Sequence, residues 1–243
     1  MLTLYKNEWL KMKRQHVWIL ILFIPIVGAL LGTFSFYSSY ELLTKDTNEW
    51  YQLWTQVTFF YGLFLYPVLS SVYATLICRN ENLQGGWKLI LGLPVSHVNF
   101  YLSKLLWLLT LLLYTQMIIL LATIMIGYQF DFISAIPIVF FIKATIFGWF
   151  ATFPLAVIQL SISMKTKSFS LPLGINIILT FGSLAAMVIG VELFYPWAFP
   201  SIAMAAPGEG SGTDTMTFIA VMIISFCILL LIGSWNFKRR EIK

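Results

Sequence analysis

Six long apolar runs, each of about 18 to 27 residues and separated by short polar connections, constrain this chain most strongly. An α-helix crosses about 30 Å of hydrocarbon with about 20 mainly apolar residues. The runs cover residues 17–37, 54–77, 100–126, 136–162, 171–191 and 218–235. They are much longer than the roughly 10 alternating residues of a barrel strand. The sequence therefore predicts an all-α membrane protein with six transmembrane helices in one transmembrane domain over residues 1–243.

Composition supports this class. Of the 243 residues, 59% are hydrophobic and 10% are charged, whereas a soluble domain is roughly 45–50% apolar and about 25% charged. The chain has too little polar surface to cover a soluble core. A soluble enzyme, a nucleic-acid-binding domain, a disulfide scaffold and a disordered regulator are therefore excluded, and we expect a lipid bilayer and no nucleic acid as partner.

The basic residues indicate an orientation. All 15 lysines and arginines except Lys45 and Lys143 fall on one side of the predicted spans. Because short cytoplasmic loops are enriched in basic residues, we predict that both termini are cytoplasmic. The first run follows Lys13 and Arg14 as a signal peptide would, but about 21 residues exceed the 7–15 of a typical signal core. We therefore expect a retained helix.

Residues 2–14 are predicted to form a helix that lies in the membrane interface. Its apolar positions recur at steps of three or four, and charged residues occupy its other faces; the apolar set is Leu2, Tyr5, Trp9 and Met12, and the charged set includes Lys6, Glu8 and Lys13. In this interpretation Tyr5 and Trp9 face acyl chains, and Lys13 and Arg14 face anionic headgroups. The alternative is a cytoplasmic extension of the first spanning helix.

The longest cytoplasmic connection covers residues 79–97. Asn80 could cap a short helix, and Glu81 would be favourable near the positive helix end. One face would then be apolar, formed by Leu83, Trp87, Ile90 and Leu91. The pattern indicates a helix beneath the membrane, and a plain amphipathic linker is the alternative.

Signs of catalysis are few. His16 and His97 are the only histidines, and neither lies in a catalytic motif. The chain lacks the Gly-x-x-x-x-Gly-Lys-Ser/Thr phosphate loop, and Cys78 and Cys227 have no metal-ligand spacing. We therefore expect no enzymatic activity and no bound cofactor or metal, so uphill transport would draw on an ion gradient or on another subunit.

A substrate path could follow aromatic residues of the second run. Its candidate residues are Phe60, Tyr61, Phe64, Tyr66 and, in the fourth run, Lys143. The aromatic side chains could equally pack or face lipid. Lys143 lies about 10 Å into its span at 1.5 Å per residue; it could reach the outer surface, pair with Glu192 or contact solute.

Small residues recur every four positions in two runs. They are Gly28 and Gly32 in the first run, and Gly182, Ala186 and Gly190 in the fifth. Such faces let helices approach closely, either within one subunit or between two. A separate apolar stretch of about 10 residues, 197–206, is too short to cross and could dip into the outer leaflet.

Three groups of residues resemble a known family. They are Asn7-Glu8-Trp9-Leu10-Lys11-Met12-Lys13-Arg14; Trp54-Thr55-Gln56-Val57 with Phe60-Tyr61-Gly62-Leu63-Phe64; and Arg79-Asn80-Glu81 with Trp87-Lys88-Leu89-Ile90-Leu91-Gly92-Leu93-Pro94-Val95 and Lys104. With these residues the chain resembles the membrane subunits of ABC-2-type transporters, particularly the small permeases of lantibiotic and bacitracin self-protection systems.

The resemblance implies that membrane transport and ATP hydrolysis are carried out by separate subunits. Residues 79–97 would be a coupling helix on a cytoplasmic ABC ATPase dimer, which binds ATP and Mg; its predicted contacts are Arg79, Asn80, Glu81, Asn82, Leu83, Gln84, Trp87 and Lys88. Residues 2–14 would be an interfacial connecting helix, and residues 194–215 would include a re-entrant hairpin. A second permease, identical or related, is expected in a bacterial cell membrane.

The function implied is removal of a hydrophobic, membrane-active peptide antibiotic from the bilayer. One alternative is an ABC-2 exporter of another hydrophobic drug or of a secreted peptide. Another is a membrane scaffold or sensor that does not transport and binds a partner through residues 79–97.

Overall fold

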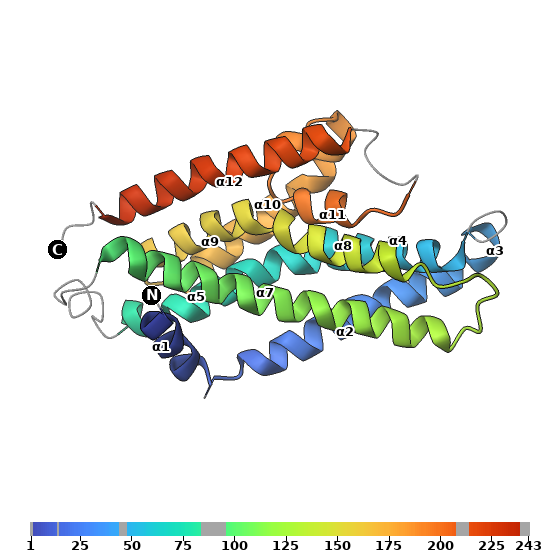
Figure 1. Ribbon diagram of the computed structural model, residues 1–243, viewed down its shortest axis with the longest axis horizontal. Helices are drawn as coiled ribbons and strands as arrows, with labels where there is room; N and C mark the ends of the chain where they lie inside the picture. Colours follow the sequence, from blue (N-terminus) through green and yellow to red (C-terminus); the bar gives the residue numbers. More distant parts are fainter. Residues whose placement is uncertain (1, 14, 44–47, 84–95, 208–213, 239–243) are drawn as a thin grey trace.

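The computed structural model describes residues 2–13, 15–43, 48–83, 96–207 and 214–238, which are mostly helical and include no strand (Figure 1). The elements are α1 (Leu2–Met12), α2 (Val17–Ser38), α3 (Tyr40–Leu43), α4 (Glu49–Phe60), the π-helix η1 (Tyr61–Leu65), α5 (Tyr66–Leu83), α7 (His97–Tyr128), α8 (Ile138–Ala151), α9 (Phe153–Lys165), α10 (Ser170–Ile189), the 3-10 helix η2 (Glu192–Phe194), α11 (Phe199–Met204) and α12 (Thr215–Lys238).

Within these residues, six segments are long and apolar enough to cross a membrane, which confirms the predicted number of spans. They are Val17–Ser38, Glu49–Arg79, His97–Tyr128, Ile138–Lys165, Ser170–Ile189 and Thr215–Lys238. The second begins at Glu49, earlier than the predicted start at Trp54, because the Asn48 side chain accepts a hydrogen bond from the Trp50 backbone N–H at 2.9 Å and caps the helix. Hydropathy does not detect such a polar first turn.

Two of the spans change geometry midway. In the second, η1 precedes Pro67, which has no backbone N–H to donate and would crowd a regular turn before it; the wider π turn accommodates the ring. In the fourth span, α8 ends at Ala151, and α9 begins with Pro154 in its first turn. Both breaks lie among buried residues, where neighbouring helices can satisfy the backbone.

The glycine face of α2 packs within the subunit. A Cβ placed on Gly32 would overlap the Val57 backbone, and one on Gly28 would lie 3.1 Å from the Tyr61 Cβ. Glycine therefore permits close approach of α2 to α4 and η1. Gly28 and Gly32 therefore pack within one subunit, which is one of the two alternatives that the sequence left open.

The connection from α10 to α12 turns back into the bundle. Met204, at the end of α11, is buried beside Gly62 and Gly148. The Trp54 indole N–H donates to the Met204 carbonyl at 2.7 Å. The apolar stretch 197–206 thus contributes to the core beside α4, η1 and α8.

Candidate functional site

Three segments that are distant in sequence meet at one end of the bundle. They are α1, the end of α5 and the start of α7 (Figure 1). The described chain ends at Leu83 and resumes at Ser96, so the helices that flank residues 84–95 both belong to this meeting point.

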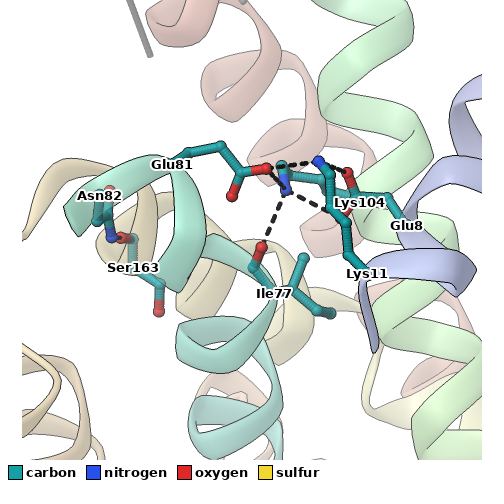
Figure 2. Close-up of polar contacts among 7 residues, drawn as sticks. All are labelled: Glu8, Lys11, Ile77, Glu81, Asn82, Lys104 and Ser163. Atoms are coloured by element: carbon teal, nitrogen blue, oxygen red, sulfur yellow. Dashed lines mark hydrogen bonds and ion pairs between the residues drawn. The ribbon is translucent and has the colours of Figure 1, made fainter. Parts of the chain in front are cut away.

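Four charged side chains form what we call the charge cluster: Glu8 and Lys11 of α1, Glu81 of α5 and Lys104 of α7 (Figure 2). The Lys104 Nζ lies 3.0 Å from the Glu8 Oε2 and 3.1 Å from the Glu81 Oε1. The Lys11 Nζ lies 2.9 Å from the Glu8 Oε1 and 2.7 Å from the Glu81 Oε1. Two lysines therefore bridge two carboxylates, and the formal charges cancel.

Lys104 lies at the centre of the cluster and is 0% exposed. Its ammonium also donates to the Ile77 carbonyl at 3.0 Å and lies 5.1 Å from the centroid of the Phe100 ring. A buried ammonium is costly unless its donors are used and its charge is balanced. Both conditions are met only when α1, α5 and α7 are together, so the cluster makes their arrangement interdependent.

Glu81 is held in its charged form. Burial alone would raise the pKa of its carboxyl, but Lys104, and then Lys11, bring the pKa below the ordinary value. Its second oxygen, Oε2, has no hydrogen-bond partner among the described residues.

The residues predicted to contact an ATPase differ in how exposed they are. Arg79 is exposed, whereas Glu81 is buried. Asn82 is also buried, and its side-chain N–H groups donate to the Ser163 and Thr166 carbonyls of the α9 end at 2.9 and 2.8 Å. The Glu81 and Asn82 side chains therefore both join helices of the same chain.

The expected helix start at Asn80 is wrong, because the hydrogen-bonded turns of α5 continue through Asn80 to Leu83. An existing helix has no free N-terminal N–H groups for Asn80 to cap. Gln84, Trp87, Lys88, Ile90 and Leu91 lie outside the described residues.

The N-terminal segment contains a helix, α1, whose described apolar side chains contact protein, although Trp9 is also exposed. The Tyr5 and Trp9 rings lie 5.3 and 5.7 Å from the Trp107 ring of α7. Glu8, expected on a polar face, is 2% exposed, because Lys104 supplies the opposite charge. Lys13 is exposed, and Arg14 lies outside the described residues. Placement of α1 in the membrane interface remains a prediction.

Two of the five predicted path residues are internal. Tyr61 and Tyr66 are buried and stacked with ring centroids 5.1 Å apart. Their hydroxyls donate to the Gln116 side chain at 3.2 Å and to the Leu112 carbonyl at 3.1 Å. In this conformation both tyrosines are packing residues with satisfied hydroxyls.

The other path candidates lie nearer the surface. Phe60 and Phe64 are half-buried, and Lys143 is exposed on α8. Lys143 forms no ion pair with Glu192, which is buried near the end of α10. The pairing alternative is therefore absent from this conformation, and a substrate path through these residues remains a prediction.

A polar network that the sequence did not predict connects the middle of the bundle. The Asn176 Oδ1 accepts from the Gln159 side chain at 2.6 Å and from the Trp197 indole at 2.7 Å, while its N–H donates to the Pro67 carbonyl at 2.8 Å. Asn176 and Gln159 interrupt apolar runs, and that interruption was the available signal.

Fold and composition define a multi-pass helical membrane protein. Residues 4–183, more than half of the chain, match the family model described as ABC-2 family transporter protein. The chain belongs to this family, and membership supports a membrane-transport permease role and partnership with an ABC ATPase. Comparisons with curated proteins and with solved structures found no match.

Proposed function

We propose that the chain is the permease subunit of an ATP-driven exporter that removes a membrane-active peptide antibiotic, of lantibiotic or bacitracin type, from a bacterial cytoplasmic membrane. Family membership supports the permease role. The resemblance of residues 7–14, 54–64 and 79–95 to self-protection permeases supports the substrate class. The activity would confer self-protection or resistance.

In this proposal the chain has no catalytic role. A cytoplasmic ATPase dimer binds ATP and Mg, and a second permease, identical or related, completes the transporter. The end of the bundle that holds the charge cluster faces the cytoplasm. Residues 84–95, together with exposed Arg79, contact the ATPase.

The observation that carries the coupling proposal is the charge cluster itself. Glu81 lies two residues before Leu83, where the described part of α5 ends, and Lys104 lies in the second turn of α7. Lys104 contacts Glu8 and Glu81 contacts Lys11, so both flanks of residues 84–95 are joined to α1. A push on this segment would therefore displace α1, α5 and α7 together rather than bend one helix.

ATP-driven closure of the ATPase dimer would provide that push. A ligand shifts a conformational equilibrium only through different affinities for the two states. Nucleotide binding favours the closed ATPase, and movement of α1, α5 and α7 as one group would change access to the path between two permeases.

Co-expression with the ATPase encoded by a neighbouring gene tests the assignment. We expect the two chains to copurify and to reduce the susceptibility of host cells to a lantibiotic or to bacitracin. Protection against only apolar drugs would favour the alternative exporter. Copurification without protection against any compound of the panel, and without transport in vesicles, would favour a scaffold or sensor.

A further inference from the structure

A cavity of about 640 Å³ opens between α4, η1, α10 and α11, in the part of the bundle away from the charge cluster. Its walls are mainly apolar, with Phe59, Leu63, Leu184 and Met187 among the lining side chains. Its volume is in the range of about 300–1,000 Å³ that small-ligand pockets occupy. The cavity can hold one or two side chains of a larger molecule.

A buried carboxylate lines this cavity. Glu192 is 9% exposed, its Oε2 has no hydrogen-bond partner, and it forms no ion pair within the described part of the chain. The Thr58 hydroxyl, from a residue 4% exposed, lines the same cavity and also lacks a described partner. Polar atoms this deeply buried are costly when unsatisfied, so the site favours a group that donates hydrogen bonds.

The end of α10 adds to the negative potential. Gly190 closes the helix with φ +78°, and its N–H and that of Val191 bond back to the Met187 and Ala186 carbonyls. Glu192, two residues after Gly190, begins η2. Because a helix C-terminus carries partial negative charge, it favours a cation beside Glu192.

The chemistry of the walls selects the type of cation. Calcium takes six to eight oxygen ligands, and magnesium requires near-octahedral oxygen coordination. The described residues contain no group of three or more His, Cys, Asp or Glu placed to hold a metal. One carboxylate and three hydroxyl residues, Thr55, Thr58 and Ser201, among apolar walls instead match an organic ammonium. Such a group donates two or three hydrogen bonds while its carbon chain contacts Phe59 and Met187.

We infer that this cavity binds a primary ammonium group of a cationic amphipathic peptide, with the Glu192 carboxylate as its charge partner and the Thr58 hydroxyl as a second acceptor. The inference rests on the proposed export function and specifies which part of such a substrate is recognised. The apolar flanks of the ammonium-bearing residue lie against Phe59, Leu63, Leu184 and Met187.

Equilibrium binding to the full-length chain, copurified with its ATPase and held without nucleotide in phosphatidylcholine nanodiscs, tests the site. The probe is a fluorescent amphipathic peptide with lysine side chains; its lysine-acetylated form keeps the apolar face but lacks the ammonium groups. Glu192→Gln keeps the side-chain shape and removes the charge, and Glu192→Asp restores a carboxylate. Asp214→Asn, at the exposed start of α12, is the matched control, since it removes one negative charge outside the cavity.

We expect Glu192→Gln to weaken binding of the lysine peptide about tenfold, which corresponds to about 1.4 kcal/mol. Glu192→Asp and Asp214→Asn should bind within about twofold of wild type. Acetylated peptide should bind wild type and Glu192→Gln equally weakly. Equal binding of the lysine peptide to wild type and Glu192→Gln would overturn the inference, as would displacement of the peptide by phosphatidylethanolamine in the nanodisc.

The binding measurement requires no transport. Unchanged binding by Glu192→Gln together with intact peptide protection would reject this site but retain the exporter. Loss of protection in every condition, with charge-dependent binding preserved at Glu192, would reject the export function but retain the ammonium site. Thermal unfolding of each variant controls for misfolding, and the Glu192→Asp variant provides the same control inside the cavity.

Discussion

At the scale of single residues, Lys104 contributes most to the charge cluster because it is fully buried and contacts both carboxylates. Lys104→Met removes the positive charge and leaves Glu8 and Glu81 with only Lys11. Breaking a buried ion pair from one side costs about 3–5 kcal/mol. We expect a large fall in the thermal unfolding midpoint of the purified permease, measured by loss of monodisperse protein after heating.

Lys11→Met is the matched control, since it deletes a lysine of the same cluster whose side chain is 34% exposed. Its effect should be clearly smaller, because solvent already screens the partly exposed Lys11 ammonium and Lys104 still contacts both carboxylates. Equal unfolding midpoints for Lys104→Met and wild type would show that the cluster does not hold α1, α5 and α7 together.

The lowered pKa of Glu81 predicts how the stability of the fold depends on pH. Its folded-state pKa lies below the ordinary value of 4.5, so the charged form stabilises the fold. That contribution is complete above the ordinary value and is lost as the pH falls through the lowered folded-state pKa. Unfolding midpoints measured from pH 7 to about pH 3 should fall in acid.

The Glu81→Gln variant isolates this carboxyl. It should be less stable than wild type at pH 7, and the difference should shrink in acid, when wild-type Glu81 is also neutral. A difference that stays constant across this range would contradict the assigned pKa direction.

At the scale of elements, close packing of α2 against α4 depends on Gly32. Gly32→Ala introduces a Cβ that overlaps the Val57 backbone, and backbone can yield only if the helices separate. We expect a lower unfolding midpoint, although alanine is the better helix former by about 1 kcal/mol. Gly174→Ala in α10, with open space around its Cβ, should be neutral or slightly stabilising, and equal effects of the two variants would contradict this packing.

The elements themselves were largely predictable, because crossing hydrocarbon requires long apolar helices and hydropathy reports that requirement directly. The residues at which the helices begin and end were harder to predict. The start at Glu49 depends on a local cap by Asn48, and the π turn at Tyr61–Leu65 depends on how one proline is accommodated. Asn80 was misread because a polar residue after an apolar run resembles a cap, whereas α5 continues beyond the membrane-length segment.

At the scale of the whole molecule, the charge cluster could not be derived from the sequence. Glu8 and Lys104 are 96 positions apart, and Lys11 and Glu81 are 70 apart. Periodicity within one segment predicts that Glu8 lies on a polar face. It cannot predict which other helix supplies the opposite charge. The family motifs that contain Glu8, Glu81 and Lys104 were visible in the sequence, but their contact with one another required the fold.

In the proposed mechanism, a separate ATPase drives the permease through residues 84–95. Its most direct test is peptide-stimulated ATP hydrolysis by the copurified complex in proteoliposomes, comparing wild type with a deletion of residues 84–93. Deletion of residues 208–212, in a connection predicted to lie on the opposite side of the membrane, is the control. We predict that the first deletion abolishes stimulation by a lantibiotic and the control retains it; equal stimulation in wild type and the 84–93 deletion would contradict the coupling mechanism.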